Sequence, residues 1–215
     1  EFEPSLHELC DLGSEEKPGA IRALFDDLGV RLEWCPMKDA FRTILTDDPD
    51  LKDYTMPFGT KEFTDKMEEY VPGSRESTEK FILLCEDLNR AVNYMTEASG
   101  HVDPKVMQKE HANFLKCAPY SVNEVLDALK MPKAAQKILG SYWCYIGVPL
   151  DRLSFFFYAI MVYKYLVGGA YIPKDRSHAI SVALAERVMA LGGEVWCNTR
   201  AEKILMRGGK PWAVQ

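Results

Sequence analysis

Several common functional motifs are absent from this sequence of 215 residues. It has no G-x-G-x-x-G fingerprint, the glycine-rich turn that holds a dinucleotide's pyrophosphate at a helix N-terminus. The chain alone is therefore not expected to bind a dinucleotide tightly. Its six cysteines form no C-x-x-C pair, so we expect reduced thiols and no metal site. No Ser-His-Asp order, paired-carboxylate motif or P-loop occurs either.

Charge and hydropathy exclude further classes of protein. The net charge is -6 and Lys and Arg form no block, so nucleic acid is not an expected partner. The most apolar stretch, residues 153–167, is shorter than the about 20 apolar residues of a membrane span and contains Lys164. The acidic start at residues 1–4 is unlike a signal peptide, which predicts a cytoplasmic protein.

The middle of the sequence is expected to be helical. With 47% hydrophobic residues the chain can form a sizeable core. Periodic apolar positions predict helices over the following ranges: 61–70, 74–99, 103–115, from Ser121 in a capping box, from Pro132 toward 145, and 150–167. Short strands are predicted at 30–34, 41–45 and 54–58, and together they suggest a small antiparallel sheet.

Residues 168–214 have clear boundaries between expected elements. A strand at 170–172 ends at Pro173, and Asp175 or Ser177 can cap the following helix. That helix carries an apolar stripe and stops at a glycine pair. Three further strands and a hairpin turn are then expected, at 194–197, 201–206, Gly208-Gly209 and 212–214. Because the sequence stops inside an expected strand, we interpret the chain as a piece of a longer protein.

The same stretch resembles a motif of flavin-dependent oxidoreductases of the amine oxidase and phytoene desaturase type. The matching residues are Tyr171-Ile-Pro-Lys174, Gly192-Gly193, Asn198-Thr199 and Glu202-Lys203-Ile204. The nearest branch is the group of phytoene desaturases, carotenoid isomerases and retinol saturases. Residues 2–7 also resemble a segment of these enzymes, with Phe2, Glu3 and His7 in agreement and Ser5 where the family has glycine.

The resemblance implies an α+β fold in three parts. Residues 1–29 and 168–215 would be partial segments of an FAD-binding α/β domain, the second a strand, helix and hairpin. Residues 30–167 would form a mainly helical substrate-binding region with a small antiparallel sheet. FAD would be bound by the full-length protein and is not expected on this chain alone.

The resemblance also implies roles for particular residues near the flavin. In the family, the segment holding Ser5 and His7 runs close to the flavin ring, so His7 is a candidate proton donor. Backbone groups at the position of Ala201 contact the adenine in the family, and Lys174 could meet a phosphate. The simpler alternatives are a His7 bonded to backbone, an ordinary strand residue at 201 and a solvated Lys174.

The apolar stretch at 153–167 has two interpretations. It is either a buried core helix or the wall of a tunnel for a long hydrocarbon. In the second case the substrate would contact aromatic and aliphatic side chains, namely Phe155, Phe156, Tyr158, Met161 and Tyr165.

The predicted function is the substrate pocket of an FAD-dependent oxidoreductase that acts on carbon-carbon bonds of an apolar molecule. Its partners would be that molecule, the FAD-binding domain of the same protein and, at the pocket mouth, a membrane surface. The isolated chain would be inactive. The alternative is a non-catalytic helical interaction or lipid-binding module. It is favoured by Ser5, Asp175 and Arg176, which replace glycines of the family pattern.

Overall fold

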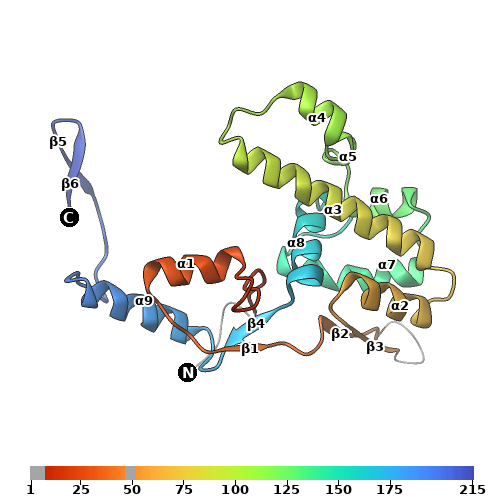
Figure 1. The fold of residues 1–215 in the computed structure, drawn as a ribbon, viewed down its shortest axis with the longest axis horizontal. Coiled ribbons are helices and arrows are strands. Elements are labelled where there is room, and N and C mark those ends of the chain that lie inside the picture. The colour runs from red at the N-terminus through yellow and green to blue at the C-terminus, as the bar shows by residue number, and fades with distance from the viewer. Residues whose placement is uncertain (1–7, 47–51) are drawn as a thin grey trace.

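The computed structural model describes residues 8–46 and 52–215 (Figure 1). One helix and three strands come first, and helices then dominate. In chain order the elements are α1 (Ala20–Leu28), β1 (Trp34–Pro36), β2 (Phe41–Ile44), β3 (Asp53–Met56), α2 (Thr60–Tyr70), α3 (Arg75–Glu97), α4 (Pro104–Glu110), α5 (Ala112–Cys117), α6 (Val122–Ala128), α7 (Lys133–Leu139), the 3-10 helix η1 (Gly140–Tyr145), α8 (Phe155–Gly168), β4 (Tyr171–Pro173), α9 (His178–Ala190), β5 (Ile204–Arg207) and β6 (Lys210–Val214).

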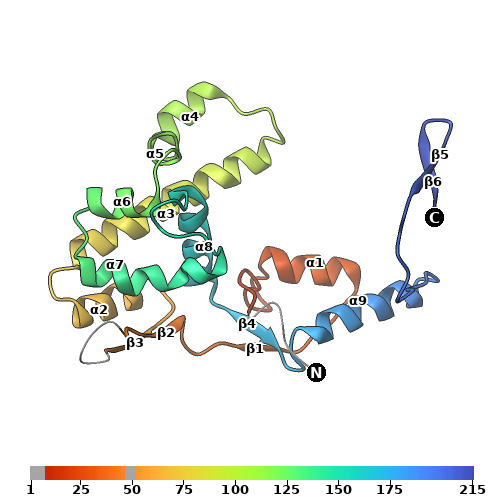
Figure 2. The same cartoon turned by 180° about the vertical axis from the view of Figure 1, so that it is seen from behind.

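The elements form an elongated molecule with a helical body at one end. Figures 1 and 2 show helices α2 to α8 gathered in this body, with β2 and β3 beneath it. Strands β1 and β4 lead away from the body toward α1 and α9. The hairpin β5–β6 lies at the opposite end of the molecule, beyond α9.

Helix α8 is the central helix of the body. Its buried residues recur at intervals of three and four and so lie on one face: Phe155, Tyr158, Ala159, Val162, Tyr165 and Leu166. This face packs mainly on α3, where the rings of Phe81 and Phe155 meet edge to face at 6.0 Å. The interpretation of 153–167 as a buried core helix is therefore confirmed for this face.

The core of the body joins α8 to α2, α3, α6, α7 and η1. Its fully buried large side chains include Phe63, Met67, Phe81, Leu88, Leu126, Ile138, Leu139, Tyr142, Phe155 and Tyr158. At about 25 cal/mol per Å² of apolar surface removed from water, this cluster is the main source of the fold's stability. The mainly helical layout predicted for 61–167 matches these elements.

The predicted single sheet from 30–34, 41–45 and 54–58 is wrong. Strand β2 pairs with β3 in one antiparallel pair, whereas β1 pairs with β4 in another. After α8 the chain enters β4, which lies beside β1 and pairs with it. Leu9 also forms a bridge with Tyr171 of β4, so β4 bonds to both β1 and the segment around Leu9. Strand β1 also begins later than expected, at Trp34.

Helix α8 begins at Phe155, five residues after the predicted start. The preceding turn is bonded to the N-terminus of α6: the Val122 N–H donates to the Leu153 carbonyl at 2.9 Å, and the Phe155 N–H donates to Tyr120 at 2.9 Å. These tertiary bonds replace the intrahelical ones. The capping box at Ser121 is confirmed, because Ser121 and Glu124 bond reciprocally.

The helix predicted over 103–115 is interrupted. Asp103 caps α4 as its position suggested, but His111 takes φ -123° and separates α4 from α5. The imidazole of His111 stacks on Tyr94 at 5.2 Å between ring centroids. This contact with α3 accompanies the break, and a single straight helix would not keep it.

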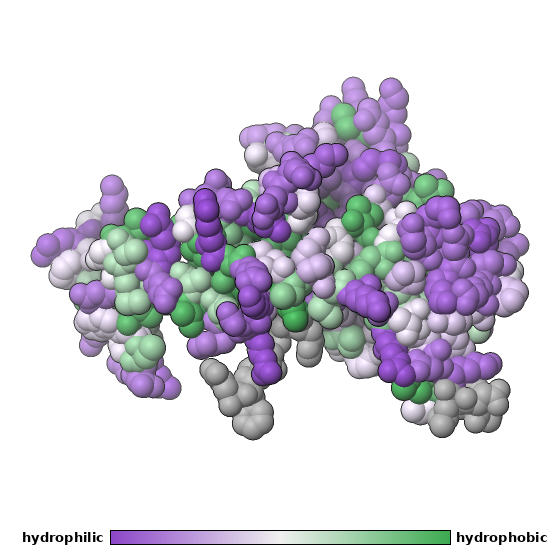
Figure 3. Space-filling view, turned by 60° about the horizontal axis from the view of Figure 1, so that its bottom comes forward, coloured by the Kyte–Doolittle hydropathy of each residue, from purple (hydrophilic) through white to green (hydrophobic). Residues whose placement is uncertain are grey.

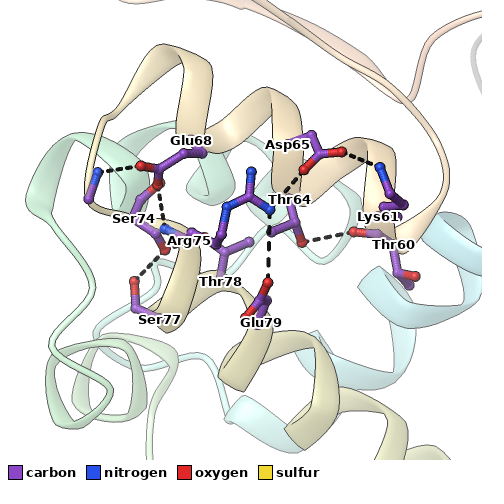
Figure 4. Close-up of polar contacts among 11 residues, drawn as sticks. Thr60, Lys61, Thr64, Asp65, Glu68, Ser74, Arg75, Ser77, Thr78 and Glu79 are labelled. Atoms are coloured by element: carbon purple, nitrogen blue, oxygen red, sulfur yellow. Dashed lines mark hydrogen bonds and ion pairs between the residues drawn. The ribbon is translucent and has the colours of Figure 1, made fainter.

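The corner between α2 and α3 is stabilised by a carboxylate from the first helix (Figure 4). Glu68 accepts hydrogen bonds from the N–H groups of Gly73 and Arg75, at 2.8 and 2.6 Å. Those N–H groups lie before and at the start of α3, where N–H groups lack intrahelical partners. Glu68 thus serves as the cap of α3, since Ser74 makes no side-chain cap bond.

The C-terminal part is much more exposed. Helix α9 has no buried residue, although it ends as predicted, with Gly192 at φ +84°. Neither predicted cap is made, because Ser177 precedes the helix without a side-chain cap bond and Asp175 lies outside its first turn. The strand predicted at 194–197 is wrong: no described strand pairs with it, and without a ladder partner it stays irregular. The hairpin β5–β6 is present, with β5 starting at Ile204.

Among the helices of the described ranges, we find none with the length and apolar content that a membrane crossing requires.

Candidate functional site

A cavity of about 730 Å³ opens beside η1 in the helical body. Its wall comes from β2, α6, α7, η1 and the turn before α8. The lining residues are Phe41, Arg42, Thr43, Leu45, Asn123, Lys133, Gln136, Lys137, Gly140, Ser141, Tyr142, Trp143, Cys144, Tyr145 and Leu150. The volume is in the range of small-molecule sites, and the aromatic wall suits an apolar ligand.

The change from α7 to a 3-10 helix at Gly140 sets the wall of this cavity. A 3-10 helix has three residues per turn, so Tyr142 and Tyr145 lie on the same side of η1. Their ring centroids are 5.8 Å apart. The Phe41 ring meets Tyr142 edge to face at 4.8 Å, which ties β2 to η1.

The inner side of the wall contacts the N-terminal segment through Glu8. The Tyr145 hydroxyl donates to the Glu8 carboxylate, and the Tyr165 hydroxyl donates to the Glu8 backbone carbonyl at 3.4 Å. Glu8 is buried, with 7% of its surface exposed. A buried carboxylate needs hydrogen-bond donors, and here Tyr145 of η1 supplies one, while Tyr165 of α8 bonds the backbone of the same residue.

Tyr142 completes this cluster without a bond of its own. Its hydroxyl is buried, and the structure gives it no hydrogen-bond partner in the described part of the chain. Burial, with a smaller effect of the Glu8 charge, raises the pKa of Tyr142 well above its usual value. Burial and the bond to Glu8 likewise raise the pKa of Tyr145. Both phenols are therefore neutral hydrogen-bonding groups and not acids at neutral pH.

The outer rim of the cavity carries cations. Arg42 is bonded to Asp53 on the neighbouring strand, and Lys133 lies 2.5 Å from Asp127. Lys137 lines the same rim. These ion pairs are exposed, so they contribute little to stability and can exchange partners.

The residues predicted to contact substrate lie behind this wall. Phe155 and Tyr158 are fully buried in the core, and the Tyr158 hydroxyl donates to the Leu139 carbonyl at 2.5 Å. Phe156 and Met161 are half-buried against the core. Tyr165 is closest to the cavity, since its ring lies 6.1 Å from Tyr142 and 5.1 Å from Tyr145.

The residues predicted to contact flavin are spread along the chain. Ser5 and His7 lie outside the described residues. Lys174 forms an ion pair with Glu33 at 2.8 Å, and this bond raises the pKa of Lys174. Ala201 lies on an exposed segment before β5. The structure thus brings neither Lys174 nor Ala201 to the cavity lining.

Arg176 departs from the family pattern in residue type but has a backbone conformation typical of glycine. Arg176 stands at one of the two positions where the resembling enzymes have glycine, and it takes φ +63°. This left-handed conformation favours glycine over other residues. The turn after β4 therefore has a backbone that the glycine pattern would suit, despite the arginine.

Sequence reasoning missed Glu8, Tyr142 and Tyr145 as a group. Tyr142 and Tyr145 are three residues apart, so they would share a face on the expected α-helix as well as on the observed 3-10 helix, but the spacing does not show that this face meets Glu8. Glu8 is more than a hundred residues away in sequence. The only available signal was the density of aromatic residues after Gly140.

Comparison with known proteins relates the chain to a reductase. It is 23% identical over 215 residues to the all-trans-retinol 13,14-reductase of Homo sapiens, and equally so to the protein of that name from Macaca fascicularis. Each alignment covers 96% of this chain and 35% of the relative. The chain thus spans about a third of the length of these relatives. No protein-family model matches it.

Proposed function

We propose that this chain is the substrate-binding section of a flavin-dependent oxidoreductase of the saturase type. The observation that carries the proposal is the similarity to all-trans-retinol 13,14-reductases, which runs through 96% of the chain, helical body included. The reaction would add hydrogen across a carbon-carbon double bond of an apolar substrate. The motifs at 171–174 and 192–204 imply the broader class of flavin-dependent oxidoreductases that act on carbon-carbon bonds, without fixing the direction of the reaction.

The cavity beside η1 is the proposed substrate pocket. Its wall of Phe41, Tyr142, Trp143 and Tyr145 suits a planar or extended hydrocarbon. The chain's share of the reaction is to bind this hydrocarbon, to orient it and to exclude water. The tyrosine hydroxyls are neutral polar groups beside this aromatic wall, whereas the cations of Arg42, Lys133 and Lys137 line its rim.

Flavin, when bound, would supply or accept the hydride. On this chain, the residues that could contact the flavin are those around Ala201, because their exposed backbone is open to a neighbouring domain. Lys174 fits less well, because Glu33 already matches its charge. The chain offers no glycine-rich cradle for the pyrophosphate, so that part of the site would come from the rest of the protein.

The proposed partner is therefore the flavin-binding domain of the same protein. Apolar side chains of the C-terminal part remain exposed, among them Met189, Leu191, Trp196, Ile204 and Trp212. Green atoms in Figure 3 appear among polar ones at the end of the molecule that holds α9 and the hairpin. Exposed apolar groups on this scale are typical of a surface that another domain covers.

The test uses the full-length protein and this chain side by side. The full-length protein should purify yellow with bound flavin, and its reduced form should convert all-trans-retinol into a product two mass units heavier, as measured by mass spectrometry. The isolated chain should be colourless and inactive while still binding retinol. These results would support two parts of the proposal, namely that this chain binds the substrate and that the rest of the protein binds the flavin.

Two outcomes would contradict the proposal. A colourless full-length protein that retains a hydrocarbon through purification would instead be a non-catalytic lipid-binding module. Turnover by the isolated chain with added flavin would show that it is not a partial enzyme. A variant with Tyr120 changed to Phe is a suitable control, because Tyr120 is 51% exposed and does not line the cavity.

A further inference from the structure

We infer that Tyr142 is the specificity-determining residue of the cavity, binding one neutral hydrogen-bonding group of the ligand while the nearby Glu8 disfavours an anionic group. The inference deepens the proposed function and rests on it, because it concerns the same pocket.

The Tyr142 side chain is buried together with its hydroxyl group. Tyr142 is 1% exposed, and its hydroxyl has no partner among the described residues. Buried polar groups almost always have a hydrogen-bond partner, so an unpaired one needs an explanation. Every other buried tyrosine of this cluster has one: Tyr158 bonds to Leu139, and Tyr165 bonds to Glu8. A ligand in the cavity that Tyr142 lines would supply the missing partner.

Access to this hydroxyl depends on Tyr145. The Tyr142 oxygen is closed off from solvent, whereas Tyr145 is 38% exposed and its ring lies 5.8 Å away. The Tyr145 side chain is fixed by its bond to Glu8. In the proposed complex a ligand that bonds to Tyr142 has to displace the Tyr145 ring and break its bond to Glu8, so both rings would contact the bound molecule.

The charge of Glu8 decides which polar group is accepted. Glu8 accepts from Tyr145, whose ring centroid lies 5.8 Å from that of Tyr142, so the Glu8 carboxylate is near the Tyr142 side chain. In a buried, weakly screened site a second negative charge is repelled strongly. A hydroxyl or carbonyl group of the ligand is therefore accepted at Tyr142, and a carboxylate is rejected.

The cations at the rim favour an anionic ligand, whereas Tyr142 and Glu8 favour a neutral one, so binding measurements can distinguish the two. Arg42, Lys133 and Lys137 line the rim, and within residues 8–46 and 52–215 no carboxylate lines the cavity. An anionic head group held at the rim would replace Asp53 or Asp127 as the partner of Arg42 or Lys133. A ligand held by its polar group at Tyr142 would be neutral. The preference between an alcohol and an acid of equal chain length distinguishes the two orientations.

The experiment measures binding of 1-decanol and decanoate to the full-length protein by titration calorimetry. The wild-type protein should bind decanol at least about tenfold more tightly than decanoate, because of the like charge of Glu8. Changing Tyr142 to Phe should weaken decanol binding about fivefold, the loss expected for one neutral hydrogen bond, and leave decanoate unchanged. Tyr120→Phe should change neither value.

Glu8→Gln provides a second, independent readout. It keeps an acceptor for Tyr145 and removes the charge, so the preference for decanol over decanoate should shrink toward unity. Tighter binding of decanoate in the wild type, decanol affinity unchanged in Y142F, or no binding of either probe would each overturn the inference. Flavin absorbance of the same samples is read separately, so a colourless protein that passes these tests refutes the proposed reaction and not the assignment of Tyr142.

Discussion

Two tyrosines in one core provide a matched pair for testing the polar cluster. Tyr158 and Tyr142 are both buried, at 0% and 1% exposure, and both could be changed to Phe with loss of one oxygen atom only. They differ in bonding: the Tyr158 hydroxyl donates to the Leu139 carbonyl at 2.5 Å, whereas the Tyr142 hydroxyl has no described partner. Their substitutions should therefore have different effects on stability.

The expected magnitudes follow from this difference. Tyr158→Phe removes a buried bond and leaves the Leu139 carbonyl without that donor, which should lower the free energy of unfolding by about 1–2 kcal/mol. The ring contact with Phe81, at 6.4 Å between centroids, is retained. Tyr142→Phe removes a buried hydroxyl that forms no hydrogen bond with the described residues in the absence of ligand. The free energy of unfolding should then stay the same or rise by up to about 1 kcal/mol.

Urea denaturation followed by circular dichroism measures both values, without added ligand. Equal slopes of unfolding free energy against urea would show that the substitutions change stability and not the unfolded state. If Tyr142→Phe destabilised the protein as much as Tyr158→Phe, the Tyr142 hydroxyl would have a partner within the protein. The explanation of Tyr142 as a ligand-binding group would then be wrong.

Three further predictions concern the rest of the fold. Ser121→Ala should lower the free energy of unfolding by about 1 kcal/mol in urea melts, because it breaks the capping box of α6. The bonds from Gly73 and Arg75 lower the pKa of Glu68 below its ordinary value of 4.5, so its contribution is present above that pH and lost as pH falls through the folded pKa. Glu68→Gln should accordingly lower the melting temperature at pH 7 and lose less stability on acidification than the wild type. Brief proteolysis of this chain should cut within residues 191–203 before the helical body, since every residue there is exposed; earlier cleavage within α3 would contradict this.

Much of the helical body was predictable because its signals are local. The apolar spacing of α3, the Asp103 cap and the capping box at Ser121 each determine structure within a few residues. The errors occur where distant contacts override local preference. The turn before α8 bonds to α6 and delays the helix to Phe155, and His111 breaks a helix beside its contact with Tyr94.

The candidate site was less predictable for the same reason. The five residues expected to contact substrate were chosen from the most apolar stretch, but the strongest apolar signal marks the core first. The cavity instead uses aromatic residues of η1, whose 3-10 geometry depends on packing against β2 and α8. Glu8 joins the cluster from the other end of the chain, and no spacing rule reveals such a contact.

The unequal burial of the two ends of the molecule bears on how such a chain would work in a larger protein. The helical body holds the buried clusters, so it can keep the pocket shaped without outside help. Helix α9 and the hairpin bury no residue and are joined to the body through β4, whose partners are β1 and Leu9. Leu9 follows Glu8 directly, and Glu8 bonds to the pocket wall. A domain that docked on α9 would therefore be connected to the pocket wall by direct contacts that run through β4 and Leu9 to Glu8.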